Sequence, residues 1–77
     1  MEEKTPDEMF EELGYKKKYS NMPWYIKKLF RNNYIQITFD IIDKTVAGSN
    51  DKGEAINLNM KELQAINKKC QELGWIE

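Results

Sequence analysis

The middle of the chain has the clearest alternation of apolar and polar residues. Over residues 35–41, polar side chains separate the apolar residues Ile35, Ile37, Phe39 and Ile41. This period of two predicts a β-strand that buries one of its faces. The preceding segment, 24–30, is expected to pair with it as a strand, because Asn32 and Asn33 tolerate the positive φ of a tight hairpin turn. A helix over 24–30 is the alternative, since Pro23 could open one and the apolar residues there also fit helical spacing.

Three shorter segments are expected to complete the sheet. One strand over 15–19 precedes the central pair, a second follows it over 45–47, and a last strand over 55–58 comes after an exposed loop at 48–53. Consecutive short strands joined by turns favour an antiparallel meander of about four strands. Such a sheet usually leaves one face to solvent and has the other face covered.

Helices are predicted at both ends of the chain, over 5–15 and 59–75. Each begins with a residue pair that has the spacing of a capping box, namely Thr5 with Glu8 and Asn59 with Glu62. Each ends in Glu-Leu-Gly-aromatic, in which the glycine supplies the left-handed residue that stops a helix and the aromatic residue folds back on the last turn. Apolar stripes are expected at Met9, Phe10 and Leu13 in the first helix, and at Leu63, Ile66, Asn67, Cys70 and Leu73 in the second.

Together these elements predict an α+β fold. An N-terminal helix, an antiparallel meander of about four strands and a C-terminal helix follow one another, and the C-terminal helix packs on one sheet face. With 77 residues the chain has room for a single small domain spanning 1–77, and residues 1–4 are expected to be disordered. A composition that is 40% hydrophobic and 12% aromatic is typical of a folded domain.

The residue types that are missing narrow the functional classes. The chain has no histidine and one cysteine, Cys70. An internal disulfide, the usual zinc ligands and the Ser–His and Cys–His nucleophile pairs are therefore excluded within one chain. We expect no catalytic residues, no metal, no cofactor and no enzymatic activity. No apolar run approaches the ~20 residues of a membrane span, and the acidic N-terminus is unlike a signal peptide, so we expect a cytoplasmic protein without a membrane partner.

Charge is unevenly distributed, although the net charge is only −1. Residues 13–39 hold six of the twelve Lys and Arg residues and none of the thirteen Asp and Glu residues. Aromatic residues interleave with these cations, at Tyr15, Tyr19, Trp24, Tyr25, Phe30 and Tyr34. Cations that hold phosphates and rings that stack on bases would form a nucleotide or single-stranded nucleic-acid site on a sheet face. If rings and cations lie on opposite faces instead, the rings are core and the lysines are a solvated surface.

Binding to another protein is the leading hypothesis. Interface energy concentrates in Trp, Tyr and Arg, and cations steer an acidic partner. The candidate binding residues are the anchors Trp24, Tyr25 and Trp75, with Lys27, Lys28 and Arg31 for steering. Trp75 also has a purely structural interpretation, in which Gly74 lets the ring fold back on the helix. A structural homodimer, paired through an edge strand or through helix 59–75, is a further alternative.

The two ends of the chain resemble a known group of sequences. The resembling segments are TPDEMFEELGY at 5–15 and KELQAINKKCQELGW at 61–75, about a third of the chain. They are similar to small uncharacterised accessory proteins common in phages and prophages of low-GC Gram-positive bacteria (Firmicutes). The resemblance implies a mobile-element protein made in the cytoplasm of the bacterial host cell. It also implies a partner, since small proteins of this kind often bind and block a host protein, including components of defence systems.

Overall fold

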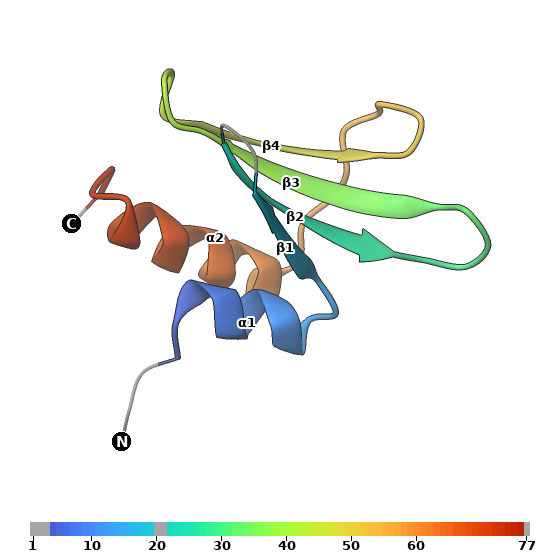
Figure 1. Cartoon of the computed structure of the whole chain (residues 1–77), viewed down its shortest axis with the longest axis horizontal. Coiled ribbons are helices and arrows are strands. Elements are labelled where there is room, and N and C mark those ends of the chain that lie inside the picture. Colours follow the sequence, from blue (N-terminus) through green and yellow to red (C-terminus); the bar gives the residue numbers. More distant parts are fainter. Residues whose placement is uncertain (1–3, 20–21, 77) are drawn as a thin grey trace.

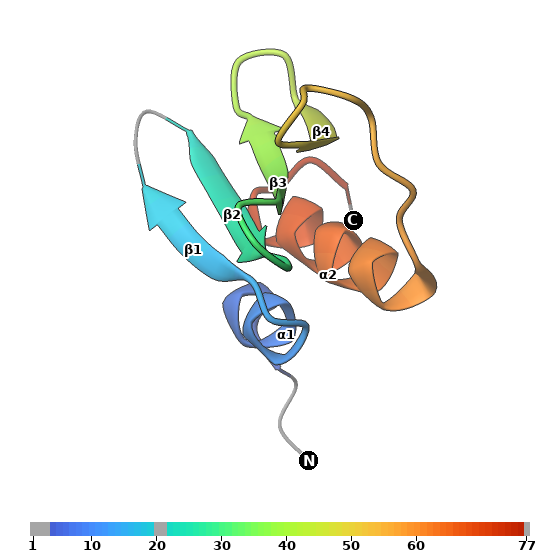
Figure 2. The same ribbon diagram turned by 90° about the vertical axis from the view of Figure 1, so that its right-hand side faces the viewer.

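The computed structural model describes residues 4–19 and 22–76 of the chain. Its elements are α1 (Pro6–Glu12), β1 (Lys16–Tyr19), β2 (Pro23–Lys28), β3 (Tyr34–Asp40), β4 (Thr45–Asn50) and α2 (Met60–Glu72). The strands form one antiparallel sheet in the order β1-β2-β3-β4, and both helices lie on the same side of it (Figures 1 and 2). The α+β fold predicted from the sequence is therefore confirmed.

The helix ends follow the predicted signals closely. Capping boxes are formed by Thr5 with Glu8 and by Asn59 with Glu62. At the other end of α1 the N–H of Tyr15 donates to the carbonyl of Phe10 over 2.9 Å, around a left-handed Gly14. The N–H of Trp75 donates to the carbonyl of Cys70 over the same distance, around Gly74. Both helices thus end in a Schellman motif, which leaves the chain turned back towards the core.

The segment at 24–30 resolves in favour of the strand. Residues 24–28 of this segment belong to β2, which pairs on one side with β1 and on the other with β3. The connection to β3 differs from the predicted Asn32–Asn33 turn. Arg31 is the residue with positive φ, at 63°, and the N–H of Leu29 donates to the carbonyl of Asn33 over 2.8 Å. The loop is therefore longer than a two-residue turn.

The structure after β3 differs from the prediction in two ways. β4 is longer than the predicted 45–47 and includes Gly48, which was assigned to a loop. The predicted strand at 55–58 is reduced to one bridge between Ala55 and Ser49, with the N–H of Ile56 donating to the carbonyl of Gly48 over 3.4 Å. The chain touches β4 there and then leaves the sheet to begin α2 (Figure 1).

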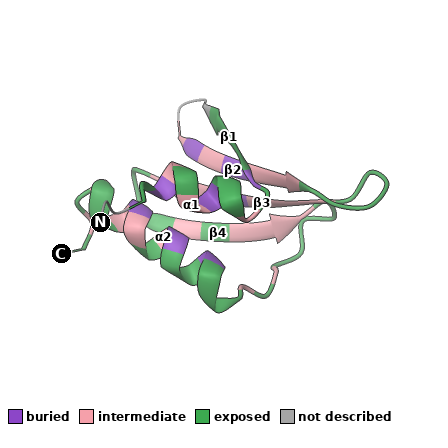
Figure 3. Cartoon of the chain, turned by 90° about the horizontal axis from the view of Figure 1, so that it is seen from below, coloured by how far each residue is buried: buried purple, intermediate pink, exposed green. Residues whose placement is uncertain are grey.

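The core lies between the sheet and the two helices. Its fully buried side chains come from α1, β2, β3, α2 and the residue before β1, at Phe10, Tyr25, Ile37, Phe39, Ala65 and Tyr15. Figure 3 shows the buried positions of both helices on the sides that meet the sheet and each other. The buried face of α2 agrees with the predicted stripe in part, because Ile66, Cys70 and Leu73 pack against the core. Leu63 is 43% exposed and Asn67 is exposed, whereas Glu62 and Lys69 are buried.

The described residues begin at Lys4. Of the segment 1–4 that is expected to be disordered, Met1, Glu2 and Glu3 lie outside the described residues. The ammonium of Lys4 donates to the carboxylate of Glu12 over 2.6 Å. This exposed ion pair joins the residue before the N-cap of α1 to the last residue of the helix.

Candidate binding surface

Both helices of the described chain lie on one face of the sheet, and the strand register fixes which side chains lie on the other face. Tyr25 pairs with Ile37, and both are buried beneath the helices. Neighbouring residues of a strand point to opposite faces, so Trp24 and Thr38, which also pair, lie on the uncovered side. We call this the open face. Its described residues are Lys16 and Lys18 of β1, Trp24, Ile26 and Lys28 of β2, Tyr34, Gln36, Thr38 and Asp40 of β3, and Thr45, Ala47 and Ser49 of β4.

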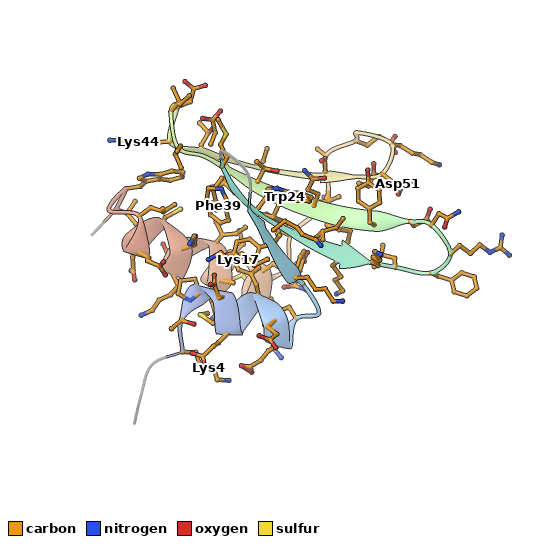
Figure 4. The ribbon with its side chains drawn as sticks, viewed as in Figure 1. Lys4, Lys17, Trp24, Phe39, Lys44 and Asp51 are labelled. Carbon is orange, nitrogen blue, oxygen red and sulfur yellow. The ribbon has the colours of Figure 1, made fainter. Side chains whose placement is uncertain are left out.

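Three large side chains give the open face an apolar centre. Trp24, Ile26 and Tyr34 are all half-buried, so part of each side chain packs on its neighbours and part faces solvent. Trp24 and Ile26 are successive open-face residues of β2, and Tyr34 begins the adjacent strand. At a rise of about 3.4 Å per residue, the Tyr34 position lies roughly 14 Å along β3 from the row that contains Trp24. Figure 4 labels Trp24 on this sheet and Phe39 of β3, which points into the core.

The charge on the open face is predominantly positive. Lys16 and Lys18 lie on the edge strand, and Lys28 lies across from Tyr34 at the end of β2. Asp40 is the one acidic residue of this face within the described chain. Its carboxylate accepts the backbone N–H groups of Ile42 and Asp43 over 2.9 and 3.0 Å, so it is engaged in the β3–β4 turn. Lysines therefore border an apolar strip on two sides.

Tyr25 is a correction to the predicted site. Its side chain has no exposed surface, and its ring stacks on Phe10 with the centroids 4.0 Å apart. Its hydroxyl donates to the carboxylate of Asp7 over 2.6 Å. A partner cannot reach this ring, because α1 covers it. Tyr25 therefore ties α1 to the sheet and is not a surface anchor.

The contacts of Asp7 also set its electrostatics. Burial raises the pKa of Asp7, but the hydrogen bonds from Tyr25 and Lys17 and the positive charges of Lys17 and Lys69 outweigh this effect. The net result is a pKa below the usual value, so the carboxylate stays ionised in the fold. The ammonium of Lys17 donates to it over 2.9 Å, which fixes a β1 lysine on the helix side of the sheet.

The three predicted steering cations are separated. Lys28 lies on the open face, whereas Lys27 is on the helix side, with its ammonium 5.7 Å from the centre of the Tyr15 ring. Arg31 lies in the β2–β3 loop, where its guanidinium is 5.4 Å from the centre of the exposed Phe30 ring. A strand cannot present adjacent residues on one face, so the cluster expected from the sequence does not form.

Trp75 packs against the core, as its structural interpretation expected. Its ring packs on Phe39 with the centroids 6.2 Å apart, at the edge of the hydrophobic core. Trp24 is thus the one predicted aromatic anchor that reaches the open face. Sequence reasoning did not select Ile26, and it considered Tyr34, Lys16 and Lys18 only for the nucleic-acid alternative and not as residues that bind a protein partner. Alternation along 24–28 and along 16–18 was the available signal, but it needed the register to say which alternate set is uncovered.

The remaining structural observations concern chemistry and membranes. Among residues 4–19 and 22–76, no group of three His, Cys, Asp or Glu side chains is arranged to hold a metal ion. Cys70 is half-buried, and burial raises the pKa of its thiol, which disfavours the reactive thiolate. No helix within the described ranges is long and apolar enough to cross a membrane.

Comparisons of the chain with known proteins found no relative. No family model matches the chain. No curated protein and no solved structure matches it either.

Proposed function

We propose that this protein is a non-enzymatic binding protein whose working surface is the open face. In this proposal its partner is a bacterial host protein with an acidic surface, and the protein is a phage or prophage accessory protein acting in the host cytoplasm. Binding would occlude the partner and change its activity, as an inhibitor of a defence or regulatory component does. The resemblance of the two chain ends to phage accessory proteins supports the setting.

The observation that carries this proposal is the uncovered apolar strip of Trp24, Ile26 and Tyr34 with Lys16, Lys18 and Lys28 around it. Aromatic residues supply contact area at a low cost in side-chain entropy, and they dominate measured interface energies. Lysines at the rim speed the approach of an acidic partner and disfavour a basic one. Burial of the strip by a partner would add the second layer that this side of the sheet lacks.

A matched capture experiment tests the proposal. Tagged protein is incubated with nuclease-treated lysate of a Gram-positive bacterium, beside a Trp24→Ala/Tyr34→Ala variant and an Ile42→Ala control. Ile42 is 78% exposed in the β3–β4 turn, so its removal deletes apolar surface away from the strip. We expect one dominant protein to be captured by the wild type and the control and lost with the double variant. Equal capture by all three, with unchanged far-UV spectra, would contradict the role of the open face.

A second candidate function is binding of single-stranded nucleic acid to the same face. It is favoured by the spacing of the Trp24 and Tyr34 positions, because about 14 Å is close to two extended nucleotide steps, and by the neighbouring lysines. Titration with a twelve-residue oligothymidylate, followed by tryptophan fluorescence, distinguishes the two candidates. Phosphate contacts give an affinity that falls steeply with salt, with a slope set by the number of contacts. Quenching that disappears between 50 and 200 mM salt would favour the nucleic acid.

A further inference from the structure

The two edges of the sheet are not equivalent. On the β4 side, Ala55 bridges to Ser49 and the N–H of Ile56 reaches the carbonyl of Gly48. Gly48 makes this close approach possible, because a Cβ at that position would lie 3.0 Å from Cγ1 of Ile56. On the β1 side, none of the described residues pairs with the outer edge of the strand. The backbone groups along that edge are therefore open to a further strand.

The side chains of β1 define what such a strand would meet. Lys16 and Lys18 point to the open face, and Lys17 points to the helix side, where it pairs with Asp7. A shallow hollow of about 520 Å³ lies on that side of the edge, lined by Asp7, Glu11, Gly14, Tyr15, Lys16 and Lys17. An added strand would thus face two lysines with one set of alternate residues, and with the other set a hollow in which two lysines balance the two carboxylates. Acidic residues fit the first set, and uncharged residues fit the second.

We infer that the outer edge of β1 accepts an extended acidic segment of the partner protein by strand addition. In such recognition, main-chain hydrogen bonds supply the affinity and alternate side chains supply the specificity. The segment would carry acids at alternate positions opposite Lys16 and Lys18. A second copy of this chain fits less well, because β1 against β1 would bring lysines together on the same face and like charges across strands repel. The inference deepens the proposed function and rests on it, since the edge continues directly into the open face.

The probe is a blocked seven-residue peptide in which glutamate alternates with valine. Two further peptides carry N-methyl groups, one on the glutamate nitrogens and one on the valine nitrogens, and a fourth has lysine in place of glutamate. Because a strand offers alternate N–H groups to each side, methylation of one set abolishes pairing with β1 and methylation of the other leaves it intact. Binding to the full-length protein is followed by amide NMR shifts and by hydrogen exchange of the β1 amides.

We expect the unmethylated peptide and one methylated peptide to bind, with slower exchange at the amides of β1. The other methylated peptide and the lysine peptide should not bind. Lys16→Glu/Lys18→Glu should weaken binding roughly tenfold at low salt, and Lys52→Glu/Lys61→Glu, which reverses two exposed lysines away from β1, should not. Thermal melts of both variants check that they remain folded.

Four results would overturn the inference. Equal binding of the two methylated peptides would show attraction by charge without strand pairing. NMR shifts confined to Trp24 and Tyr34, without slower hydrogen exchange in β1, would show that the peptide binds to the open face. Absence of binding at millimolar peptide would also contradict the inference. So would dimerisation of the protein alone through β1. The capture experiment with Trp24→Ala/Tyr34→Ala leaves β1 intact, so the proposed function succeeds or fails separately.

Discussion

The hydroxyl of Tyr15 donates a hydrogen bond to the carboxylate of Glu62, and both side chains are buried. Tyr15 is the residue that closes the Schellman motif of α1, and Glu62 belongs to the capping box of α2. The second carboxylate oxygen accepts the N–H of Asn59 over 2.9 Å. One carboxylate therefore joins the end of the first helix to the start of the second, which lies 47 positions further along the chain.

Tyr15→Phe should destabilise the fold by about 1–3 kcal/mol, because the substitution leaves a buried carboxylate oxygen without its donor. Urea unfolding followed by far-UV circular dichroism measures this loss. Tyr34→Phe is the matched control, since it removes a hydroxyl from a half-buried open-face ring, and it should change stability by less than about 0.5 kcal/mol. Equal effects of the two substitutions would show that the Tyr15 hydrogen bond contributes nothing specific.

Tyr15 should also make the fold sensitive to alkali. Burial, together with the hydrogen bond and negative charge of Glu62, raises the pKa of Tyr15 above its ordinary value of 10.0. The unfolded chain then releases this proton at a lower pH than the folded chain does. Stability is therefore complete below pH 10 and falls as the pH rises above it. Urea midpoints measured from pH 8 to 11 should decline more steeply for the wild type than for Tyr15→Phe. Parallel curves would rule out this linkage.

Asp7 should give the opposite dependence at acid pH. Its pKa in the fold lies below the ordinary 3.8, so its contribution is present above that value and is lost as the pH falls through the folded pKa. Asp7→Asn should cost about 1 kcal/mol at pH 7, a modest figure because the carboxylate is partly open to solvent. The variant should also lose less stability than the wild type between pH 5 and pH 2. Glu11→Gln, on an exposed position of the same helix, serves as the control.

Gly74→Ala should lower stability by roughly 1 kcal/mol through the backbone alone. Gly74 has φ of 78°, and an added Cβ would meet no atom within 4 Å, so the cost is that of a left-handed residue with a side chain. Gly74→Asn should recover part of the loss, because Asn tolerates this conformation better than Ala. Thermal unfolding of the three proteins gives the order. An alanine variant as stable as the wild type would mean that the Schellman motif is not needed.

The two tryptophans should respond differently to truncation. Trp75 packs on Phe39 at the edge of the core, so Trp75→Ala should cost about 2 kcal/mol or more as it uncovers that ring. Trp24 lies on the open face and has no helix above it, so Trp24→Ala should cost about 1 kcal/mol or less. Chemical denaturation of both variants tests the contrast. A larger loss for Trp24 would show that its ring supports the fold more than a surface residue should.

The helix ends were predictable because their signals are local. Thr5 with Glu8, and Gly14 with Tyr15, act over a few residues, so no knowledge of the tertiary structure is needed to recognise them. The same holds for the strand at 35–41, whose alternation is unbroken. The segment at 24–30 had two periodicities, and pairing with strands on both sides decided in favour of β2.

The open face was not predictable, because it depends on the register of β2 against β3. A two-residue turn at Asn32 and Asn33 would pair Arg31 with Tyr34, but the structure pairs Lys28 with Tyr34. That is a shift of three residues, and an odd shift exchanges the two faces of a strand. The sequence alone therefore left open whether Trp24 or Tyr25 would be buried.

The buried face of α2 was predictable only in part, for a different reason. Hydrophobicity favoured Leu63, yet the helix buries Glu62 and Lys69 on either side of Ala65. Each of these charged groups is satisfied in the fold, Glu62 by Tyr15 and Lys69 by the carboxylate of Glu72 over 3.3 Å. A polar residue is tolerated in a core only when its partner is present, and such partners are distant in the sequence.

The contact of Ile56 with Gly48 has a consequence for how the protein could aggregate. Because this contact occupies part of the outer edge of β4, the strand of another copy could not pair along the whole of β4. Replacing Gly48 with a residue that expels Ile56 would uncover this part of the edge and favour the edge-to-edge pairing from which fibres propagate. The missing side chain of one glycine thus helps to protect one end of β4 from pairing with another copy.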